Sequence, residues 1–143
     1  MSTKLGELLV KEGLISPDEL ETALEHQKER GGKIGECLVR LGILSEQYIL
    51  ATLATKYRLP IVDLARFEID ERAAHLLPIT FARRNRCIPI SKADGKLQVA
   101  MADPVDLTVI DDIRFMTGLD IEASLSTSTG IMNAIARLDV WKS

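Results

Sequence analysis

The sequence contains only two cysteines and two histidines, and this scarcity excludes several classes of protein. Cys37 and Cys87 lie far apart in the sequence, so they form neither a CxxC redox pair nor a cysteine-rich zinc site. His26 and His75 belong to no HExxH motif and have no cysteine at zinc-binding spacing, so we expect them on helix surfaces and expect no metal site. Both cysteines stand among apolar neighbours, which favours buried packing over nucleophilic catalysis and suits a reducing cytosol.

The sequence also lacks the glycine-rich loops with which many enzymes hold phosphate groups. No GxxxxGK[ST] motif occurs, which argues against ATP hydrolysis by this chain. Carboxylates are plentiful, but Glu19, Glu21 and Glu25 are typical of a solvated helix face. Asp111 and Asp112 are typical of the first turn of another helix. We therefore expect no enzyme, no catalytic residue and no cofactor, unless the fold assembles a carboxylate pair in space.

Neither an excess of positive charge nor a long apolar run is present. The net charge of −3 and the isoelectric point near 5.4 argue against general binding to DNA or RNA. Charged residues recur every few positions, so we expect no direct membrane insertion. With 46% hydrophobic and 27% charged residues, the 143-residue sequence can still bury a core, and we expect a globular protein of one domain or two small ones.

What the sequence does contain is a repeat near its N-terminus. The segment KLGE at residues 4–7 returns as KIGE at residues 33–36, 29 residues later. The same shift aligns residues 13–16 (GLIS) with residues 42–45 (GILS). A fixed period predicts a duplicated structural unit, here a short helix, a glycine turn and a second helix in each copy. Two similar faces suit one ligand with two-fold symmetry.

Local signals place the helices of the repeat. Gly13 stands where a helix end favours a left-handed residue. Residues 16–19 (SPDE) supply a serine N-cap, a proline at the first helical position and a capping box with Glu19. The second helix is expected to end at residues 30–32, and Ser45 is expected to cap the equivalent helix, which runs through about Tyr57.

Strands replace helices in the second half of the sequence. Residues 59–64 (LPIVDL) are apolar and extended, because Pro60 disfavours helix before it, and we predict a crossing segment there. Asp70 is expected to cap a short helix that ends at Leu77, and residues 80–85 are expected to form another turn or two. A hairpin with its turn at residues 94–95 follows. A helix ending at Gly118, a strand over 119–125 and a last helix over 130–138 complete the series.

The predicted fold class is therefore α+β. An N-terminal four-helix subdomain (1–58) is built from two helix-turn-helix repeats. A linker (59–69) leads to a small ββαβα subdomain with a three-stranded sheet (70–143).

Both repeats resemble the tandem motif of the MshEN family, the N-terminal domain of type IV pilus and type II secretion ATPases, with the pattern RLGxx[LVI][LVI]xxG[LVI][LVI]xxxxLxxxLxxQ. Members of that family bind cyclic di-GMP, so the resemblance implies a cyclic di-GMP site. The first copy would contribute Lys4, Leu5, Gly6, Leu9, Val10, Gly13, Leu14, Ile15, Leu20, Leu24 and Gln27. The second copy would contribute Lys33, Ile34, Gly35, Leu38, Val39, Gly42, Ile43, Leu44, Ile49, Leu53 and Lys56.

The polar ends of the motif depart from the family pattern. Lys4 and Lys33 stand where the family has arginine, and Lys56 stands where it has glutamine. Arginine offers a planar fork that pairs bidentately with guanine, whereas lysine is a point charge. Each repeat is expected to hold half of the dinucleotide, with leucines and valines against base and ribose and lysines against guanine edges or phosphate. Gly6 and Gly35 are expected to let the ligand approach the backbone.

The remainder of the sequence resembles the same family. Typical phrases are residues 77–78 (LP), 88–90 (IPI), 99–104 (VAMADP), 110–114 (IDDIR) and 117–118 (TG). In that family this region precedes a hexameric motor and docks onto the cytoplasmic domain of an inner-membrane platform protein. The resemblance therefore implies a cytoplasmic location, peripheral at the inner membrane through a partner. No motor sequence follows here, so we expect an excised domain or a stand-alone relative.

Two functions stay open at this point. In the first, cyclic di-GMP clamps the repeats, and residues 59–64 act as a hinge to the second half. In the second, the repeats are only a folded helical core, which is the use that their spacing alone favours, and the chain is an adaptor for the motor domain or the platform protein. The lysine substitutions favour the adaptor. Its docking site would be an apolar helix face or the basic cluster of Arg83, Arg84 and Arg86, with Lys92 and Lys96 nearby in sequence; the alternative for the cluster is a solvated helix end.

Overall fold

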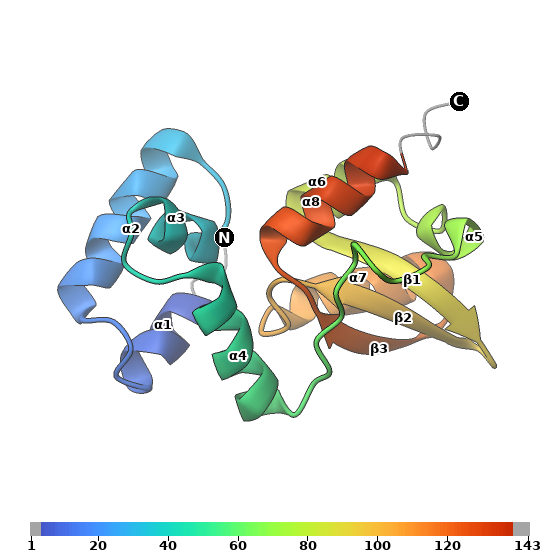
Figure 1. Cartoon of the computed structure of the whole chain (residues 1–143), viewed down its shortest axis with the longest axis horizontal. Coiled ribbons are helices and arrows are strands. Elements are labelled where there is room, and N and C mark those ends of the chain that lie inside the picture. The colour runs from blue at the N-terminus through green and yellow to red at the C-terminus, as the bar shows by residue number, and fades with distance from the viewer. Residues whose placement is uncertain (1–3, 139–143) are drawn as a thin grey trace. The chain divides into compact units, whose positions relative to one another are not determined.

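The computed structural model describes residues 4–138, and its contacts divide the chain into two compact units, Met1–Ala51 and Thr52–Ser143. The fold is α+β, as predicted: helices come first, and a three-stranded sheet with flanking helices follows (Figure 1). The predicted division into subdomains 1–58 and 70–143 with a linker at 59–69 stays a prediction, because it requires that the two parts fold independently. None of the described helices is long and apolar enough to cross a membrane.

Four helices form the N-terminal repeats, as the two-copy pattern predicts. They are α1 (Lys4–Lys11), α2 (Pro17–Arg30), α3 (Ile34–Arg40) and α4 (Glu46–Tyr57), the last of which continues into the second unit. The predicted capping box starts α2: the Ser16 N–H donates to Glu19 Oε1 (2.8 Å) and the Glu19 N–H donates to Ser16 Oγ (3.0 Å). At the equivalent start of α4, the Tyr48 N–H donates to Ser45 Oγ (3.1 Å).

The turns after α1 and α3 have the same backbone geometry. In the first copy the N–H of Gly13 (φ 77°) donates to the Val10 carbonyl, and the Leu14 N–H donates to the Leu9 carbonyl. In the second copy Gly42 (φ 73°) bonds to Val39, and Ile43 bonds to Leu38, in the same way. These are paired Schellman motifs, in which a left-handed glycine satisfies the last carbonyls of a helix. The duplication in sequence is therefore a duplication in structure.

The second unit contains the predicted ββαβα series after two short helices. Its elements are α5 (Glu71–Ala74), α6 (Ile79–Asn85), β1 (Cys87–Ala93), β2 (Lys96–Met101), α7 (Leu107–Thr117), β3 (Asp120–Leu125) and α8 (Ser128–Arg137). The sheet order is β1-β2-β3, with β1 antiparallel and β3 parallel to β2. Asp94 (φ 54°) and Gly95 (φ 76°) both have positive φ, as a two-residue type I′ hairpin turn requires.

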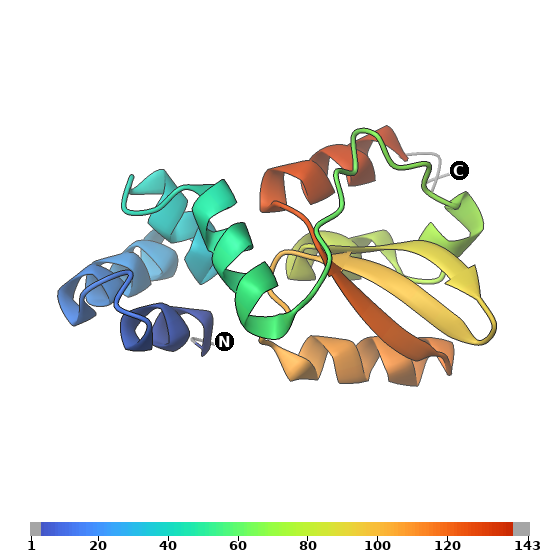
Figure 2. The same ribbon diagram turned by 60° about the horizontal axis from the view of Figure 1, so that its bottom comes forward.

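Helices cover both faces of this sheet. Figure 2 shows α7 on one face and α6 and α8 on the other. Leu97, Val99 and Met101 alternate along β2 and pack with Val109 and Ile113 in one buried cluster. Ala100 points the opposite way and packs in a second cluster with residues of α6 and α8. The sheet is thus buried on both faces.

Two sequence expectations in the second unit need adjustment. The segment predicted as a linker is extended, but it hydrogen-bonds to the end of β3: the Val62 N–H donates to the Leu125 carbonyl, and the Leu125 N–H donates to the Pro60 carbonyl, each at 2.8 Å. Leu64 of the same segment is buried in the sheet cluster. The helix capped by Asp70 ends at Ala74 rather than at the predicted Leu77.

Candidate functional site

The two motif glycines occupy equivalent packing positions. A Cβ atom added to Gly6 would lie 2.5 Å from Leu20 Cδ1, and one added to Gly35 would lie 4.0 Å from Ile49 Cδ1. Leu20 and Ile49 are themselves equivalent in the repeat. The Gly35 position is further narrowed by Leu5 Cδ2 at 3.3 Å, a contact between the copies. The missing side chains therefore let helices pack closely, and Gly6 in particular is filled by leucine rather than left open for a ligand.

Burial separates the predicted ligand residues into two groups. The buried group lies in the core and consists of Leu5, Gly6, Leu9, Ile15, Gln27, Ile34, Leu38, Ile49 and Leu53. The accessible group is exposed or half-buried and consists of Lys4, Val10, Gly13, Leu14, Leu20, Leu24, Lys33, Gly35, Val39, Gly42, Ile43, Leu44 and Lys56. The residues of the first group therefore pack in the helical core, which is the alternative role that their spacing also predicts. Only the second group offers surface to a ligand without rearrangement.

Lys4 and Lys33 stand at the starts of α1 and α3. Lys4 is exposed and is the first residue of α1, while Lys33 is half-buried and is the N-cap of α3. The backbone N–H of Lys33 donates to Glu36 Oε1 at 3.2 Å, which fixes the start of this helix. The two copies therefore present ammonium groups from equivalent backbone positions, a suitable arrangement for a ligand that carries two phosphates.

The spacer between the copies is held by polar contacts. Gln27 is 6% exposed, and its Nε2 donates to the Gly32 carbonyl at 2.9 Å. The Gly31 carbonyl accepts from Arg40 Nη1 (3.2 Å) and from Cys37 Sγ (3.6 Å). The motif glutamine thus has a structural partner in the first copy. Leu53 and Lys56 lie in the last turns of α4, and their part in a ligand site stays a prediction.

The predicted basic cluster is smaller in space than in sequence. Arg86 is the left-handed C-cap of α6 (φ 50°), and its guanidinium donates to the Arg83 carbonyl. Lys96 lies at the far end of the β1–β2 hairpin from α6, about 20 Å away by strand rise, and forms an ion pair with Glu122 (3.7 Å). The structure therefore separates Lys92 and Lys96 from the arginines, and Arg84 is the most exposed member of the remaining group.

Both thiols and one imidazole nitrogen are buried in the structure. Cys37 and Cys87 are fully buried, and burial raises the pKa of the Cys37 thiol, with Arg40 lowering it and Glu36 raising it further by smaller amounts. His75 is exposed, but His26 is half-buried rather than on the surface, and its Nδ1 is buried without a hydrogen-bond partner. Within residues 4–138 no three metal-ligating side chains lie together.

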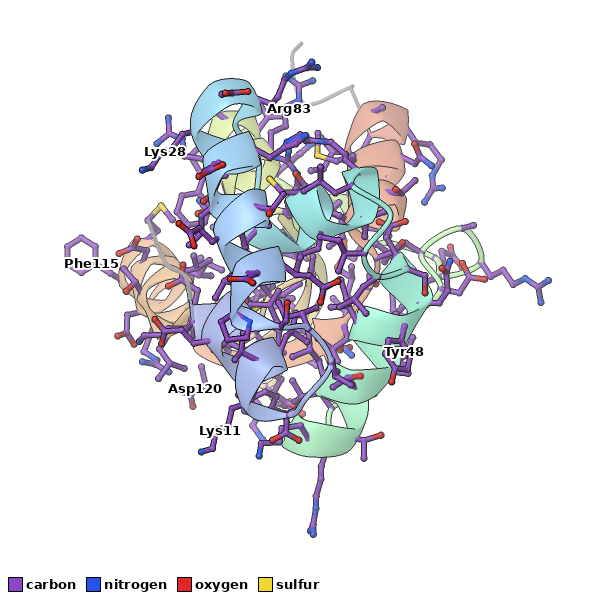
Figure 3. The ribbon with its side chains drawn as sticks, turned by 90° about the vertical axis from the view of Figure 1, so that its left-hand side faces the viewer. Lys11, Lys28, Tyr48, Arg83, Phe115 and Asp120 are labelled. Atoms are coloured by element: carbon purple, nitrogen blue, oxygen red, sulfur yellow. The ribbon has the colours of Figure 1, made fainter. Side chains whose placement is uncertain are left out.

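Sequence reasoning missed one prominent surface feature. Phe115 is 90% exposed on α7, and Figure 3 shows its ring projecting away from the helix. The buried stripe of α7 contains Val109 and Ile113, and a residue two positions after Ile113 falls on a different face. That periodicity was the available signal, because it separates Phe115 from the apolar residues that face the sheet.

Together the fold and the repeats define an α+β domain with a duplicated helical motif. Residues 57–139 match the family model of the MshEN domain. The chain belongs to the MshEN domain family, the N-terminal domain of PilB- and GspE-type pilus and secretion ATPases, as the sequence predicts. The matched residues lie after most of the repeat region, so likeness in the repeats depends on comparisons that span nearly the whole chain.

Relatives of known class supply that comparison. The type IV pilus assembly ATPase PilB of Myxococcus xanthus is 36% identical over 137 residues, which is 96% of this chain. The type II secretion system protein E of Xanthomonas campestris is 30% identical over 141 residues, which is 94% of this chain. The chain spans only 24% of the length of each of these relatives.

Solved structures show the same similarity. A structure of MshE with cyclic di-GMP is 36% identical with a TM-score of 0.68, and the match covers 96% of this chain and 99% of that one. A structure of the N-terminal domain of XpsE is 27% identical with a TM-score of 0.70, covering 94% of this chain and 93% of that one. Both matches include the repeats as well as the sheet.

Proposed function

We propose that the duplicated helical motif binds cyclic di-GMP and that the chain is a regulatory, non-catalytic domain of a type IV pilus or type II secretion ATPase system. The observation that carries this proposal is the 36% identity to MshE, solved with cyclic di-GMP, over almost the whole length of both chains. The repeated backbone geometry supports it, because a two-fold ligand favours two equivalent halves. A cytoplasmic location follows from this function as part of the proposal.

Burial separates the predicted residues into those that pack the helices together and those that contact the ligand. The buried leucines and isoleucines hold the helices in register, and the accessible residues contact the ligand. Val10 and Leu14 of the first copy correspond to Val39 and Ile43 of the second, and all four are half-buried. Their apolar surfaces suit the faces of bases and riboses, while the ammonium groups suit phosphates or guanine edges.

Calorimetric titration of cyclic di-GMP into the purified chain at low salt tests this proposal. We expect selective binding with a Kd of about 1 μM, or ~8 kcal/mol. GTP and cyclic di-AMP are the controls and should release no comparable heat. Absence of heat at tens of micromolar protein would reject nucleotide binding and leave the second function below.

A second candidate function, docking onto a partner protein, is favoured by the surface of α7. Phe115 leaves 90% of its surface in solvent, although burying an aromatic ring is strongly favourable. Asp112 and Asp111 lie three and four residues before it, respectively, and are both exposed. An exposed aromatic beside carboxylates is suited to a partner with an apolar pocket and basic residues, such as a platform protein.

We expect Phe115→Asp to weaken such docking at least ~10-fold, since aromatic anchors dominate many interfaces. The stability of the chain should change by less than about 0.5 kcal/mol, because the ring contacts little of the fold. Pull-down of a candidate platform domain, followed by a binding titration, measures the effect. Arg84→Asp is the matched control and should leave docking unchanged. If Arg84→Asp weakened docking and Phe115→Asp did not, the docking site would lie at the basic cluster instead.

A further inference from the structure

The two edges of the sheet in the second unit are covered to different extents. At the β1 edge the Asp70 N–H donates to the Ile90 carbonyl at 3.0 Å, and Pro89 has no N–H to offer to an added strand. At the β3 edge, residues 60–62 pair with the carboxyl end of the strand at Leu125. Figure 2 shows β3 along the front edge of the sheet. The rest of this strand is therefore the place to look for unpaired backbone groups.

The backbone of β3 faces outward at two residues before Leu125. The N–H and C=O groups of successive strand residues point to alternate sides. Those of Leu125 point away from β2, so those of Ile121 and Ala123 do the same. The residues between them face β2, as the bond from the Asp120 N–H to the Gly95 carbonyl (3.1 Å) shows. Within residues 4–138 no hydrogen bond reaches the outward groups of Ile121 and Ala123, which we call the free edge of β3.

The side chains beside the free edge differ between the two faces of the sheet. Ile121 and Ala123 are half-buried in the cluster that contains residues of α7, so part of their apolar surface stays accessible. Asp120 and Glu122 are exposed on the opposite face. Glu122 pairs with Lys96, but its side chain stays 61% exposed, and exposed ion pairs contribute little. The free edge is thus apolar on one face and acidic on the other.

The register of β3 argues against a second copy of this chain as the occupant. Two antiparallel β3 strands use both free residues only when Ile121 of each copy lies opposite Ala123 of the other. That register places the two Glu122 side chains directly opposite each other, which is destabilising for like charges. Registers centred on Ile121 or Ala123 would need Leu119 or Leu125, whose N–H groups are already bonded.

We infer that the free edge of β3 binds an extended segment of another protein, which adds to the sheet as a further strand. This segment carries a basic side chain beside Glu122 and apolar side chains beside Ile121 and Ala123. Residues 60–62 already add to the same edge at its carboxyl end, so the new strand continues an existing pairing. The acidic face selects a basic partner by charge complementarity, while backbone hydrogen bonds supply affinity.

A six-residue peptide of alternating valine and lysine with blocked ends is the probe, and nuclear magnetic resonance of the whole chain measures its binding. We expect saturable binding with a Kd of about 100 μM. At about 1 mM peptide, amide exchange at Ile121 and Ala123 should slow about 10-fold, because pairing covers both N–H groups. A peptide of alternating valine and glutamate is the control and should bind at least ~5-fold more weakly.

Ala123→Pro tests the backbone pairing directly. It removes one outward N–H, and an edge position accepts proline because no bond of the sheet is lost. We expect peptide binding to weaken at least ~10-fold, with little change in Tm. Ala123→Val is the matched control, since it also adds apolar atoms but keeps the N–H, and it should change the Kd less than about 2-fold.

Asp120→Asn together with Glu122→Gln tests the selection by charge. This double variant keeps the backbone edge, so both peptides should bind to it, with affinities that differ less than about 2-fold. Equal binding of both peptides to the unmodified chain would overturn the inference, as would no binding of the lysine peptide at about 1 mM.

The exchange data distinguish the free edge from other binding places. Peptide binding that survives Ala123→Pro, or that leaves exchange at Ile121 and Ala123 unchanged, would overturn the inference. Slow exchange at both residues in the free chain at every concentration would mean that the chain itself covers the edge. Slowing that grows with protein concentration would assign the edge to a second copy, and either result would also overturn the inference.

Discussion

Replacing both Lys4 and Lys33 by glutamate is expected to lower the affinity for cyclic di-GMP at least ~100-fold, which is ~3 kcal/mol. The proposed ligand carries two phosphates, and each lysine stands at the same position of its copy. A charge-assisted hydrogen bond contributes about 1.5–3 kcal/mol, and reversal of the charge adds repulsion to that loss. Calorimetry on the double variant measures the effect.

The fold should tolerate these substitutions. Lys4 is exposed, and Lys33 precedes α3 as its N-cap, where negative charge at a helix start is favourable. The matched control is Lys11→Glu together with Lys28→Glu, which makes the same change in net charge at exposed positions that the motif does not specify. That control should change affinity less than about 3-fold, mainly through long-range charge. Equal losses in both double variants would mean that general charge, rather than the motif positions, controls binding.

Substitution of the same two lysines by arginine tests the base specificity of the proposed site. Lys4→Arg and Lys33→Arg together restore the residue of the family pattern, and the guanidinium fork can pair with both acceptors on guanine. We expect tighter binding of cyclic di-GMP, by about 10-fold, together with stronger discrimination against cyclic di-AMP. Unchanged affinity and discrimination would indicate that the lysines contact phosphate rather than base.

Signals that involve neighbouring residues predicted the fold well. The capping box at Ser16, the left-handed glycines and the Asp94-Gly95 turn depend on contacts within a few residues, so the sequence carries them fully. The period of 29 residues also fixed the equivalence of the two copies. The end of α5 was less predictable, because Leu77 is buried in a tertiary cluster rather than held by the helix.

Contacts between distant residues explain what the sequence did not reveal about the site. The role of Gly6 depends on Leu20 of another helix, and Gly35 is approached by Leu5 of the other copy. A motif glycine that admits a ligand and one that admits a leucine have the same sequence pattern. Lys96 was likewise grouped with the arginines by sequence distance, although a strand separates them. The substitution of Gly6 by a bulky residue would therefore test packing as well as ligand binding.

Leu38→Ala is expected to destabilise the repeat unit by about 3 kcal/mol, because it removes a large side chain that is fully buried. Leu9→Ala should have a similar effect, since Leu9 is equally buried and occupies the aligned place in the first Schellman motif. Residues at this helical position commonly pack against the residue after the glycine, so the turn is weakened with the core. Denaturant unfolding with hydrogen exchange measures both losses.

The same experiment decides whether the predicted subdomains fold independently. If they do, Leu38→Ala should increase amide exchange in residues 4–51 and leave protection in β1, β2 and β3 unchanged. Ile113→Ala is the reciprocal control, because this residue is fully buried against the sheet and should affect only the second unit. A loss of protection in both units from either substitution would make the chain one cooperative domain. In that case a ligand bound to the repeats would stabilise the sheet directly, and residues 59–64 would couple the units as a rigid connection rather than as a hinge.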